Sequence, residues 1–184
     1  MTKGEDVVLN VQFVNAWLKE DWKLEADAKA FWTKLGLISA EERERRVKEL
    51  CAVGYLDGQV VVVSTVTVSP VPQVRAKLGM YRCAVDPDHR RQDLAERISG
   101  YTRQVLEMWS VENPQEKVLG YGAIIQAPEL MRKGLEPIWH DWGTDLVLAG
   151  YTQRGEQIRV GWFRHAKLEG PAPAEEPRPE GLTQ

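Results

Sequence analysis

Along the hydrophobic pattern of the chain, one stretch in which apolar runs flank a turn dipeptide gives the strongest signal, and it predicts a β-hairpin. The short run 54–56 and the run 59–68, which is rich in β-branched residues, flank the dipeptide Asp57-Gly58. Asp-Gly readily adopts the positive φ angles of a two-residue turn, so we expect the two runs to pair as antiparallel strands. Two prolines follow, and we expect them to end the second strand near Val68.

Apolar runs elsewhere predict five further strands. One of these runs contains two glycines, Gly120 and Gly122, which indicate a bulge or a close approach of two backbones. The last two runs surround a short polar segment and are expected to pair with each other. The five runs cover residues 7–11, 77–85, 118–125, 146–151 and 158–163.

Apolar residues at helical spacing predict the helices between these strands. The clearest case recurs every three or four positions and forms one continuous buried face; it comprises Leu94, Ile98, Tyr101, Val105 and Trp109. Residues 15–34 predict one or two helices, and Gly36 is expected to end that segment. A short helix is predicted over residues 128–133.

Another helix is predicted to begin at a capping box. Ser39 and Glu42 have the spacing at which a serine side chain accepts a hydrogen bond from the amide three residues later. We expect this helix to turn Val47, Leu50 and Cys51 inward. The predicted order is therefore strand, helices, three strands, helix, strand, helix and two strands. Hairpins mixed with crossovers indicate an α+β fold, with one mixed central sheet flanked by helices.

Composition narrows the class of protein. The chain has 184 residues, which suits one domain, and we expect that domain to cover residues 1–168. Residues 169–184 are rich in proline and glutamate and lack aromatic residues, which predicts a disordered tail. The net charge of −3 gives no overall attraction to nucleic acid or to an anionic membrane, although a local basic patch is not excluded.

Cysteine content and hydropathy favour a cytoplasmic protein. No run approaches the roughly 20 apolar residues that span a bilayer, and no signal peptide is evident. The two cysteines, Cys51 and Cys83, form no disulfide framework and have no metal-ligand spacing. A reduced compartment is therefore expected, with no metal and no membrane partner. The apolar faces of the last two strands are compatible with a homodimer.

The segment after residue 85 carries the candidate chemistry. Here an apolar strand leads through Asp86-Pro87 and two adjacent arginines, Arg90 and Arg91, into the helix that begins near Leu94. The first amides of a helix are free of intrahelical partners and attract anions, and nearby arginines strengthen that attraction. This turn is therefore a candidate phosphate-binding site.

The order of elements, centred on this turn, resembles the GCN5-related N-acetyltransferase (GNAT) superfamily over most of residues 7–165. The matching motif is a strand ending in Val-Asp-Pro, followed by Arg/Gln-x-x-Gly-x-Gly/Ala. A weaker likeness is Gln126-Ala127-Pro128 before a short helix. The resemblance implies that the turn holds the pyrophosphate of acetyl-coenzyme A (acetyl-CoA) through Arg90, Arg91, Gln92, Leu94 and Ala95. It implies further that Cys83 and Val85 offer backbone groups to the pantetheine arm.

By this resemblance the activity is acyl-CoA-dependent transfer of an acetyl group to an amine, on a small molecule or a protein. A backbone N–H would stabilise the oxyanion. Asp93 departs from the motif, because it occupies the position of the middle glycine. Asp93 and Glu96 also have capping-box spacing, which predicts a self-satisfied helix start that binds nothing. Against this, aspartate tolerates the left-handed conformation that the turn needs.

Two alternatives follow from this departure. One is a catalytically silent protein of the same fold that binds a partner or nucleic acid. The other is an acyltransferase that uses a donor other than coenzyme A. The tyrosine that many family members place after the fifth strand is absent from residues 130–134, which also favours a silent protein.

The sequence leaves the acid and base of the reaction unidentified. Tyr121 and His140 are the nearest titratable candidates, although half-buried aromatic residues bound to backbone groups are the commoner reading of both. Trp139 and Trp142 flank His140 in an expected loop, where they would line an acceptor pocket or, more commonly, plug the end of the sheet. Cys83 is expected to be a buried small apolar residue rather than a nucleophile.

Overall fold

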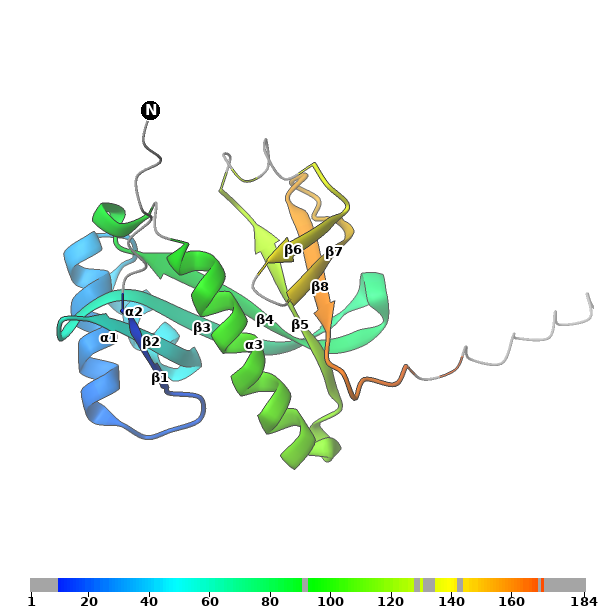
Figure 1. The fold of residues 1–184 in the computed structure, drawn as a ribbon, viewed down its shortest axis with the longest axis horizontal. Helices are drawn as coiled ribbons and strands as arrows, with labels where there is room; N and C mark the ends of the chain where they lie inside the picture. The colour runs from blue at the N-terminus through cyan, green and yellow to red at the C-terminus, as the bar shows by residue number, and fades with distance from the viewer. Residues whose placement is uncertain are drawn as a thin grey trace, which may run out of the picture.

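The structure is a computed structural model that describes residues 10–90, 93–127, 130, 135–141, 144–168 and 170. Figure 1 shows its strands and helices as a sheet with helices on both faces. The strands are β1 (Gln12–Asn15), β2 (Leu50–Leu56), β3 (Gln59–Val71), β4 (Ala76–Val85), β5 (Val118–Ile125), β6 (Ile138–Asp141), β7 (Thr144–Tyr151) and β8 (Gln157–Trp162). The α-helices are α1 (Trp22–Leu35), α2 (Ala40–Arg46) and α3 (Leu94–Glu112). Short 3-10 turns, η1 to η4, cover Val47–Glu49, Pro72–Val74, Pro87–His89 and Pro114–Glu116.

The described strands form one eight-stranded sheet in the order β1-β2-β3-β4-β5-β8-β7-β6. Every neighbouring pair is antiparallel except β4 and β5, which are parallel and are connected through α3. A connection between parallel strands needs a crossover, and α3 supplies it. The α+β class and the mixed, mostly antiparallel sheet flanked by helices are therefore confirmed.

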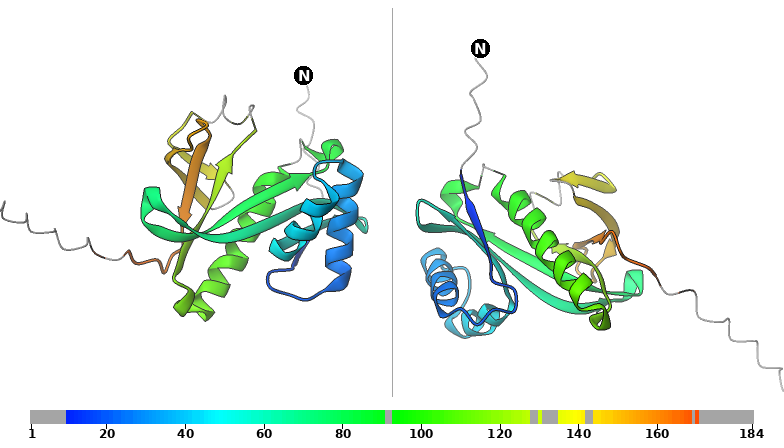
Figure 2. Two further views of the ribbon diagram at one scale, coloured as in Figure 1. Left: turned by 180° about the vertical axis from the view of Figure 1, so that it is seen from behind. Right: turned by 60° about the horizontal axis from the view of Figure 1, so that its bottom comes forward.

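The two faces of the sheet are covered differently. Val62 and Val63 are adjacent on β3 and point to opposite faces, as the alternation of a strand requires. Val63 packs with α1, whereas Val62 packs with Leu94 and Ile98 of α3. Figure 2 shows the same division. In the view from behind, α1 and α2 lie in front of the sheet, and α3 lies across its other face. The buried Ser64 and Thr102 hydroxyls are 2.7 Å apart and join β3 to α3.

The hairpin and the long helix match the sequence predictions. Asp57 and Gly58 have φ angles of 48° and 78° between β2 and β3. The second strand continues to Val71 rather than ending near Val68, because β4 pairs with it as far as Val71. Helix α3 buries Leu94, Ile98 and Val105 as its spacing predicts.

The first part of the chain corrects two predictions. The first strand is Gln12–Asn15 rather than residues 7–11; of the predicted range, Val11 is described and buried outside the strand, and residues 7–9 lie outside the described part. Asn15 belongs to this strand, and the following helix begins only at Trp22, where the Asp21 side chain accepts the first amides. Pairing with β2 makes Gln12–Asn15 a strand, and that pairing is a tertiary contact.

The capping box at Ser39 is confirmed, since its hydroxyl accepts the Glu42 amide at 3.1 Å. The helix ends earlier than expected, at Arg46. Val47, Leu50 and Cys51 are buried as predicted, but they lie on η1 and β2 rather than on the helix.

The expected loop around Trp139 and His140 contains an additional strand, β6, at the edge of the sheet. Of the predicted helix over residues 128–133, only Leu130 is described, and it is helical. The predicted close approach at the glycines of β5 is confirmed. A Cβ at Gly120 would meet the Gly161 carbonyl oxygen, and one at Gly122 would lie 2.8 Å from the Arg159 carbonyl oxygen.

No helix in the described part of the chain is long and apolar enough to span a membrane. The predicted tail over residues 169–184 lies outside the described residues, apart from Gly170.

Candidate functional site

The turn after β4 is fixed by Asp86, a buried carboxylate with 3% of its surface exposed. Its Oδ2 lies 2.8 Å from Lys34 Nζ on α1, and its Oδ1 accepts the Asp88 amide at 3.1 Å. The hydrogen bond from Lys34 lowers the pKa of Asp86, and burial works against that shift. Asp86 therefore remains a carboxylate at neutral pH and holds η3 against α1 at the entrance to the arginine segment.

Arg90 follows η3 and is exposed. Its guanidinium makes no ion pair with any other described residue, so its charge is available to a ligand. Arg91 and Gln92, which the resemblance also assigns to the cofactor, lie outside the described residues.

Asp93 adopts the left-handed conformation, with φ 53° and ψ 18°, immediately before the first residue of α3. Its carboxylate accepts no capping hydrogen bond, so the predicted capping box with Glu96 is wrong. The backbone conformation is the physical reason, because an N-cap side chain reaches the helix amides from an extended backbone.

The start of α3 leaves backbone donors available. The first helical bond runs from the Arg97 amide to the Asp93 carbonyl at 2.9 Å. The amides of Leu94 and Ala95 precede it and have no acceptor among the described residues. The Leu94 side chain is buried beneath the helix, while Ala95 is exposed at the surface.

The parallel strands β4 and β5 separate just before this turn. They pair only from Lys77–Val118 to Met80–Gly122, although β4 continues to Val85 and β5 to Ile125. Figure 1 shows the two strands diverging, with the beginning of α3 near the end of β4. The edge of β4 beyond Met80 therefore faces β5 without pairing to it.

Alternation along β4 identifies the groups on this open edge. The Asp86 amide donates to the Val61 carbonyl at 2.8 Å, so Asp86 directs its backbone toward β3. In an antiparallel ladder every second residue does the same, which assigns Ala84 and Arg82 to β3. The intervening residues, Tyr81, Cys83 and Val85, direct their N–H and C=O groups toward β5. The ladder to β5 ends at Met80–Gly122, so Cys83 and Val85 have no strand partner there among the described residues.

Cys83 corrects another prediction, because it is exposed rather than buried. It pairs with Ser64, so its side chain lies on the face that α3 covers. Dense surroundings raise the pKa of its thiol to about 11, although its own surface is accessible. The thiol is therefore largely protonated at neutral pH, and a nucleophilic role is not supported.

The two acid or base candidates have contrasting environments. Tyr121 on β5 is completely buried, and its ring centroid lies 6.1 Å from that of Tyr81 on β4. His140 is exposed on β6, where its Nδ1 lies 2.7 Å from an Asp145 oxygen on β7. Neither is the half-buried aromatic residue that the sequence favoured, and the His140–Asp145 pair is an exposed cross-strand contact.

Tyr81 is an acid candidate that sequence reasoning missed. Burial raises its pKa well above the ordinary value, so the hydroxyl stays protonated at neutral pH. Its place on the separated part of β4, next to Cys83, puts it nearer the open edge than His140. The signal was available in the sequence, since Tyr81, Cys83 and Val85 alternate along one predicted strand.

Trp139 lies on β6 rather than in a loop, and Trp142 is outside the described residues. The guanidinium of buried Arg159 stacks 3.6 Å from the Trp139 ring centroid and donates to the Glu136 carbonyl at 2.8 Å. This cation–π interaction connects β6 to β8 across the intervening strand β7. Trp139 thus packs at the end of the sheet, as the commoner of its two interpretations predicted.

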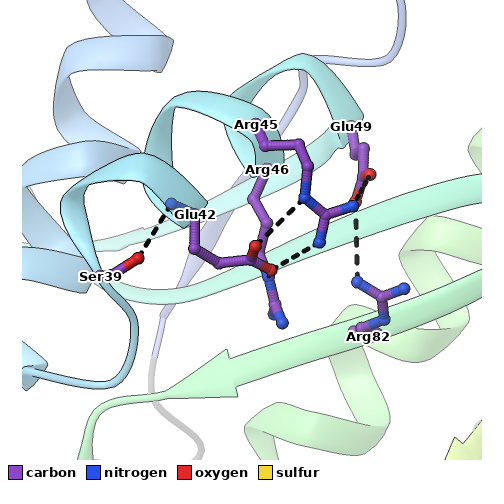
Figure 3. Close-up of polar contacts among 6 residues, drawn as sticks. All are labelled: Ser39, Glu42, Arg45, Arg46, Glu49 and Arg82. Carbon is purple, nitrogen blue, oxygen red and sulfur yellow. Dashed lines mark hydrogen bonds and ion pairs between the residues drawn. The ribbon is translucent and has the colours of Figure 1, made fainter.

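A charged network occupies the face of the sheet opposite α3 (Figure 3). Arg45 of α2 contacts Glu42 at 2.7 Å and Glu49 at 3.4 Å, and Arg46 contacts Glu42 at 2.6 Å. Glu49 also lies 3.7 Å from Arg82 of β4. The local sequence pattern does not reveal this connection between the end of α2 and β4. Among the described residues, no group of three or more His, Cys, Asp or Glu side chains is placed to hold a metal ion.

No protein-family model and no curated protein sequence matches this chain. Solved structures do match it. A mutant of the AtaT toxin, bound to the C-terminus of the antitoxin AtaR and acetyl-CoA, is 15% identical, with a TM-score of 0.50 over 82% of this chain and 91% of that one. The same mutant toxin bound to the antitoxin C-terminus is 14% identical, with a TM-score of 0.50 over 82% and 90%. A GNAT-family acetyltransferase from Streptococcus pneumoniae is 12% identical, with a TM-score of 0.48 over 83% and 97%.

The chain has the GNAT fold. The topology and the two toxin structures carry this conclusion. Within this GNAT fold, the described cofactor candidates divide into two groups. Cys83 and Val85 lie on the separated edge of β4, while Arg90 follows η3 and Leu94 and Ala95 begin α3.

Proposed function

We propose that this protein is an acyl-CoA-dependent N-acetyltransferase that transfers an acetyl group from acetyl-CoA to an amine. The observation that supports this most strongly is the open edge of β4, which leads directly to a helix start with available amides. Asp93 keeps the left-handed turn without capping the helix, so the carboxylate does not occupy the amides that a pyrophosphate needs. We also propose that residues 1–168 form a single domain.

Each part of this arrangement has a chemical role in the proposal. Acetyl-CoA would supply the acetyl group as an activated thioester. Arg90 and the amides of Leu94 and Ala95 would bind its pyrophosphate, as would Arg91 and Gln92. Cys83 and Val85 would pair through their backbones with the pantetheine arm, as an added strand pairs with a sheet edge.

Transfer also needs groups that stabilise charge. A backbone N–H on the open edge of β4 would donate to the carbonyl oxygen as negative charge develops on it. Tyr81, whose raised pKa keeps it protonated, would donate a proton to the departing thiolate. The attacking amine would approach from the face opposite α3.

Thermal-shift and product measurements test this proposal. Acetyl-CoA at about 100 times its Kd should stabilise the protein by about 2.7 kcal/mol, and incubation with an amine panel should release free coenzyme A. Arg90→Ala should weaken binding, whereas Arg154→Ala, a change at an exposed arginine in the β7–β8 turn, should not. If acetyl-CoA neither binds the natural protein nor binds Asp93→Gly, the proposal is wrong.

A second candidate is a silent GNAT-fold protein that binds a macromolecular partner. The observation in its favour is Asp93, whose negative charge stands at the start of α3 and repels a phosphate. In that case Arg90→Ala should alter partner binding in a protein that never consumes acetyl-CoA. Transfer activity without affinity for coenzyme A would instead indicate a different acyl donor.

A further inference from the structure

The side chain of Arg82 lies on the face of the sheet opposite α3. Arg82 sits between Tyr81 and Cys83 on β4, and Cys83 pairs with Ser64, which bonds to Thr102 of α3. Alternation along the strand places Arg82 on the other face. Figure 3 shows it there, directed toward Glu49 and Arg45. Arg82 is therefore beside the open edge of β4, on the side that α3 leaves uncovered.

The charges around Arg82 leave a net positive site. Arg45, Arg46 and Arg82 bring three guanidinium groups to two carboxylates, those of Glu42 and Glu49. Arg45 and Arg46 approach Glu42 at 2.6–3.1 Å. The excess charge therefore lies at the Arg82 end of the network.

Arg82 itself is only loosely engaged. Its side chain is 44% exposed, and its one ion pair among the described residues is the 3.7 Å contact between Nη1 and Glu49 Oε2. That distance exceeds a hydrogen bond, and Glu49 Oε2 is buried without a hydrogen-bond partner in the described structure. The Nε and Nη2 donors of Arg82 have no described acceptor, so the planar fork can receive an oxyanion.

The neighbouring surface on the same face is apolar. Met80 pairs with Gly122, which pairs with Val160, and Val160 pairs with Val147, so these residues share one face of the sheet. Ile124 belongs to this face by alternation, and both Ile124 and Val147 are exposed. A molecule that extends from Arg82 toward β5 would therefore meet the hydrocarbon of Met80 and Ile124.

We propose that Arg82 binds a carboxylate of the acceptor, so that the substrate is an amine which also carries a carboxylate, such as an α-amino acid with an apolar side chain. This proposal rests on the proposed acetyltransferase function, because it concerns the acceptor for the same reaction. Arg82 lies one residue from the backbone groups that would hold the thioester. A carboxylate in its fork would place the attached amine beside the open edge of β4, while the apolar side chain would lie against Ile124.

Matched acceptors test the proposal on the full-length protein. L-methionine and L-phenylalanine are compared with L-methioninamide and L-phenylalaninamide, which keep the amine and the side chain but lose the negative charge. Binding is measured by calorimetry in the presence of coenzyme A, and transfer by mass spectrometry of the acetylated product. We expect the amino acids to bind at least about tenfold more tightly than the amides.

Substitutions at Arg82 and Glu49 separate ligand binding from a structural role. Arg82→Ala should abolish the preference for the carboxylate, and Arg82→Lys should restore only part of it. Glu49→Gln removes the competing carboxylate and should strengthen binding of L-methionine. If the Arg82–Glu49 contact were purely structural, Arg82→Ala and Glu49→Gln would instead change the binding of L-methionine in the same direction. Arg154→Ala serves as the control and should leave the preference unchanged.

The possible failures are distinguishable. If the amino acids do not bind, or bind no better than the amides, the assignment of Arg82 is wrong even where acetyl-CoA binds and other amines are acetylated. If Arg82→Ala retains the full preference, the assignment is wrong as well. Failure of the proposed enzyme function has a different signature, namely no affinity for acetyl-CoA in the thermal-shift measurement.

Discussion

Asp93 determines whether the helix start can accept an anion, and it acts through both its backbone and its charge. The left-handed conformation, with φ 53°, turns the chain into α3 without using the side chain as a cap. That conformation costs most residues about 1–2 kcal/mol, and aspartate tolerates it better than most. The charge acts in the opposite direction, because a carboxylate at a helix N-terminus repels a phosphate there.

Replacing Asp93 with glycine should therefore strengthen binding of acetyl-CoA. The turn keeps its shape because glycine adopts positive φ freely, and the repulsion is removed. We expect affinity to rise by up to about fivefold, which corresponds to roughly 1 kcal/mol. Isothermal titration calorimetry measures this change directly.

Asp93→Ala separates the two effects. It removes the charge but not the conformational cost, so affinity should rise while the free energy of unfolding falls by about 1 kcal/mol. Unchanged affinity in both variants would show that Asp93 lies outside the anion site.

Asp86 gives the stability of the protein a defined pH dependence. Its pKa is lowered in the folded state, chiefly by the hydrogen bond from Lys34. The carboxylate therefore adds to the free energy of unfolding at pH values above its unfolded pKa of about 3.9. That contribution is lost as the pH falls through the lower folded value. We expect Asp86→Asn to cost about 1–2 kcal/mol at pH 7, and the difference from the natural protein to shrink below about pH 4.

Urea denaturation across this pH range measures the difference. Asp57→Asn, a change at an exposed turn carboxylate, is the matched control and should show no such dependence. A constant difference for Asp86→Asn down to the lowest pH would contradict the role of the Lys34 pair.

Among the elements, β4 and β5 are decisive because they begin as partners and then separate. Only four residue pairs join them, from Lys77–Val118 to Met80–Gly122. Beyond these pairs, Cys83 and Val85 direct their backbone groups to the open side, whereas Arg82 and Ala84 direct theirs to β3.

Amide hydrogen exchange should reveal this alternation. Without ligand, the Cys83 and Val85 amides should exchange faster than those of Arg82 and Ala84, since only the latter are held in the ladder. Acetyl-CoA should slow exchange at Cys83 and Val85 and leave Arg82 and Ala84 nearly unchanged. Residue-resolved NMR measures both states, and equal exchange along β4 would refute the open edge.

The elements that the sequence predicted well are those with strong local signals. Asp57-Gly58 defines a hairpin by itself, and the regular spacing in α3 defines one buried helix face. Of the short edge strands, β1 was placed too early in the sequence and β6 was missed, because each has only four residues. Their strand conformation depends on pairing with β2 and β7, and a local pattern does not contain that information.

The candidate site was predicted in outline for the same reason. The arginine turn was found because its residues are contiguous in the sequence. Its conformation was not, since Asp93 fits either an N-cap or a left-handed turn and only the folded chain selects between them. Glu49 and Arg82 are 33 positions apart (82 − 49) and meet only because β3 lies between β2 and β4.

At the scale of the whole molecule, the two thiols report on different events. Cys83 can react in the folded protein, whereas Cys51 reports on unfolding. Cys51 is fully buried, and burial raises its pKa to about 12, whereas Cys83 is exposed. A thiol reagent should modify one cysteine per native chain, slowly, because the pKa of Cys83 is also raised. Cys51 should react only as the protein unfolds.

Quantitative labelling followed by mass spectrometry measures both rates. Cys83→Ser should remove the native-state reaction, and acetyl-CoA should slow it in the natural protein. Rapid native labelling of Cys51 would contradict the packing around β2.

The strand order also divides the sheet into two contiguous pieces of chain. Strands β1 to β4 are consecutive in sequence and in space, and so are β5 to β8 as a group, with one parallel seam between the groups. The chain passes from one group to the other through α3 and the turn at Pro114–Glu116. A break of the chain in that turn leaves β1 to β4 together on one fragment and β5 to β8 together on the other. Two separately synthesised fragments divided there should therefore reassemble on mixing, and recovery of native circular dichroism would show it.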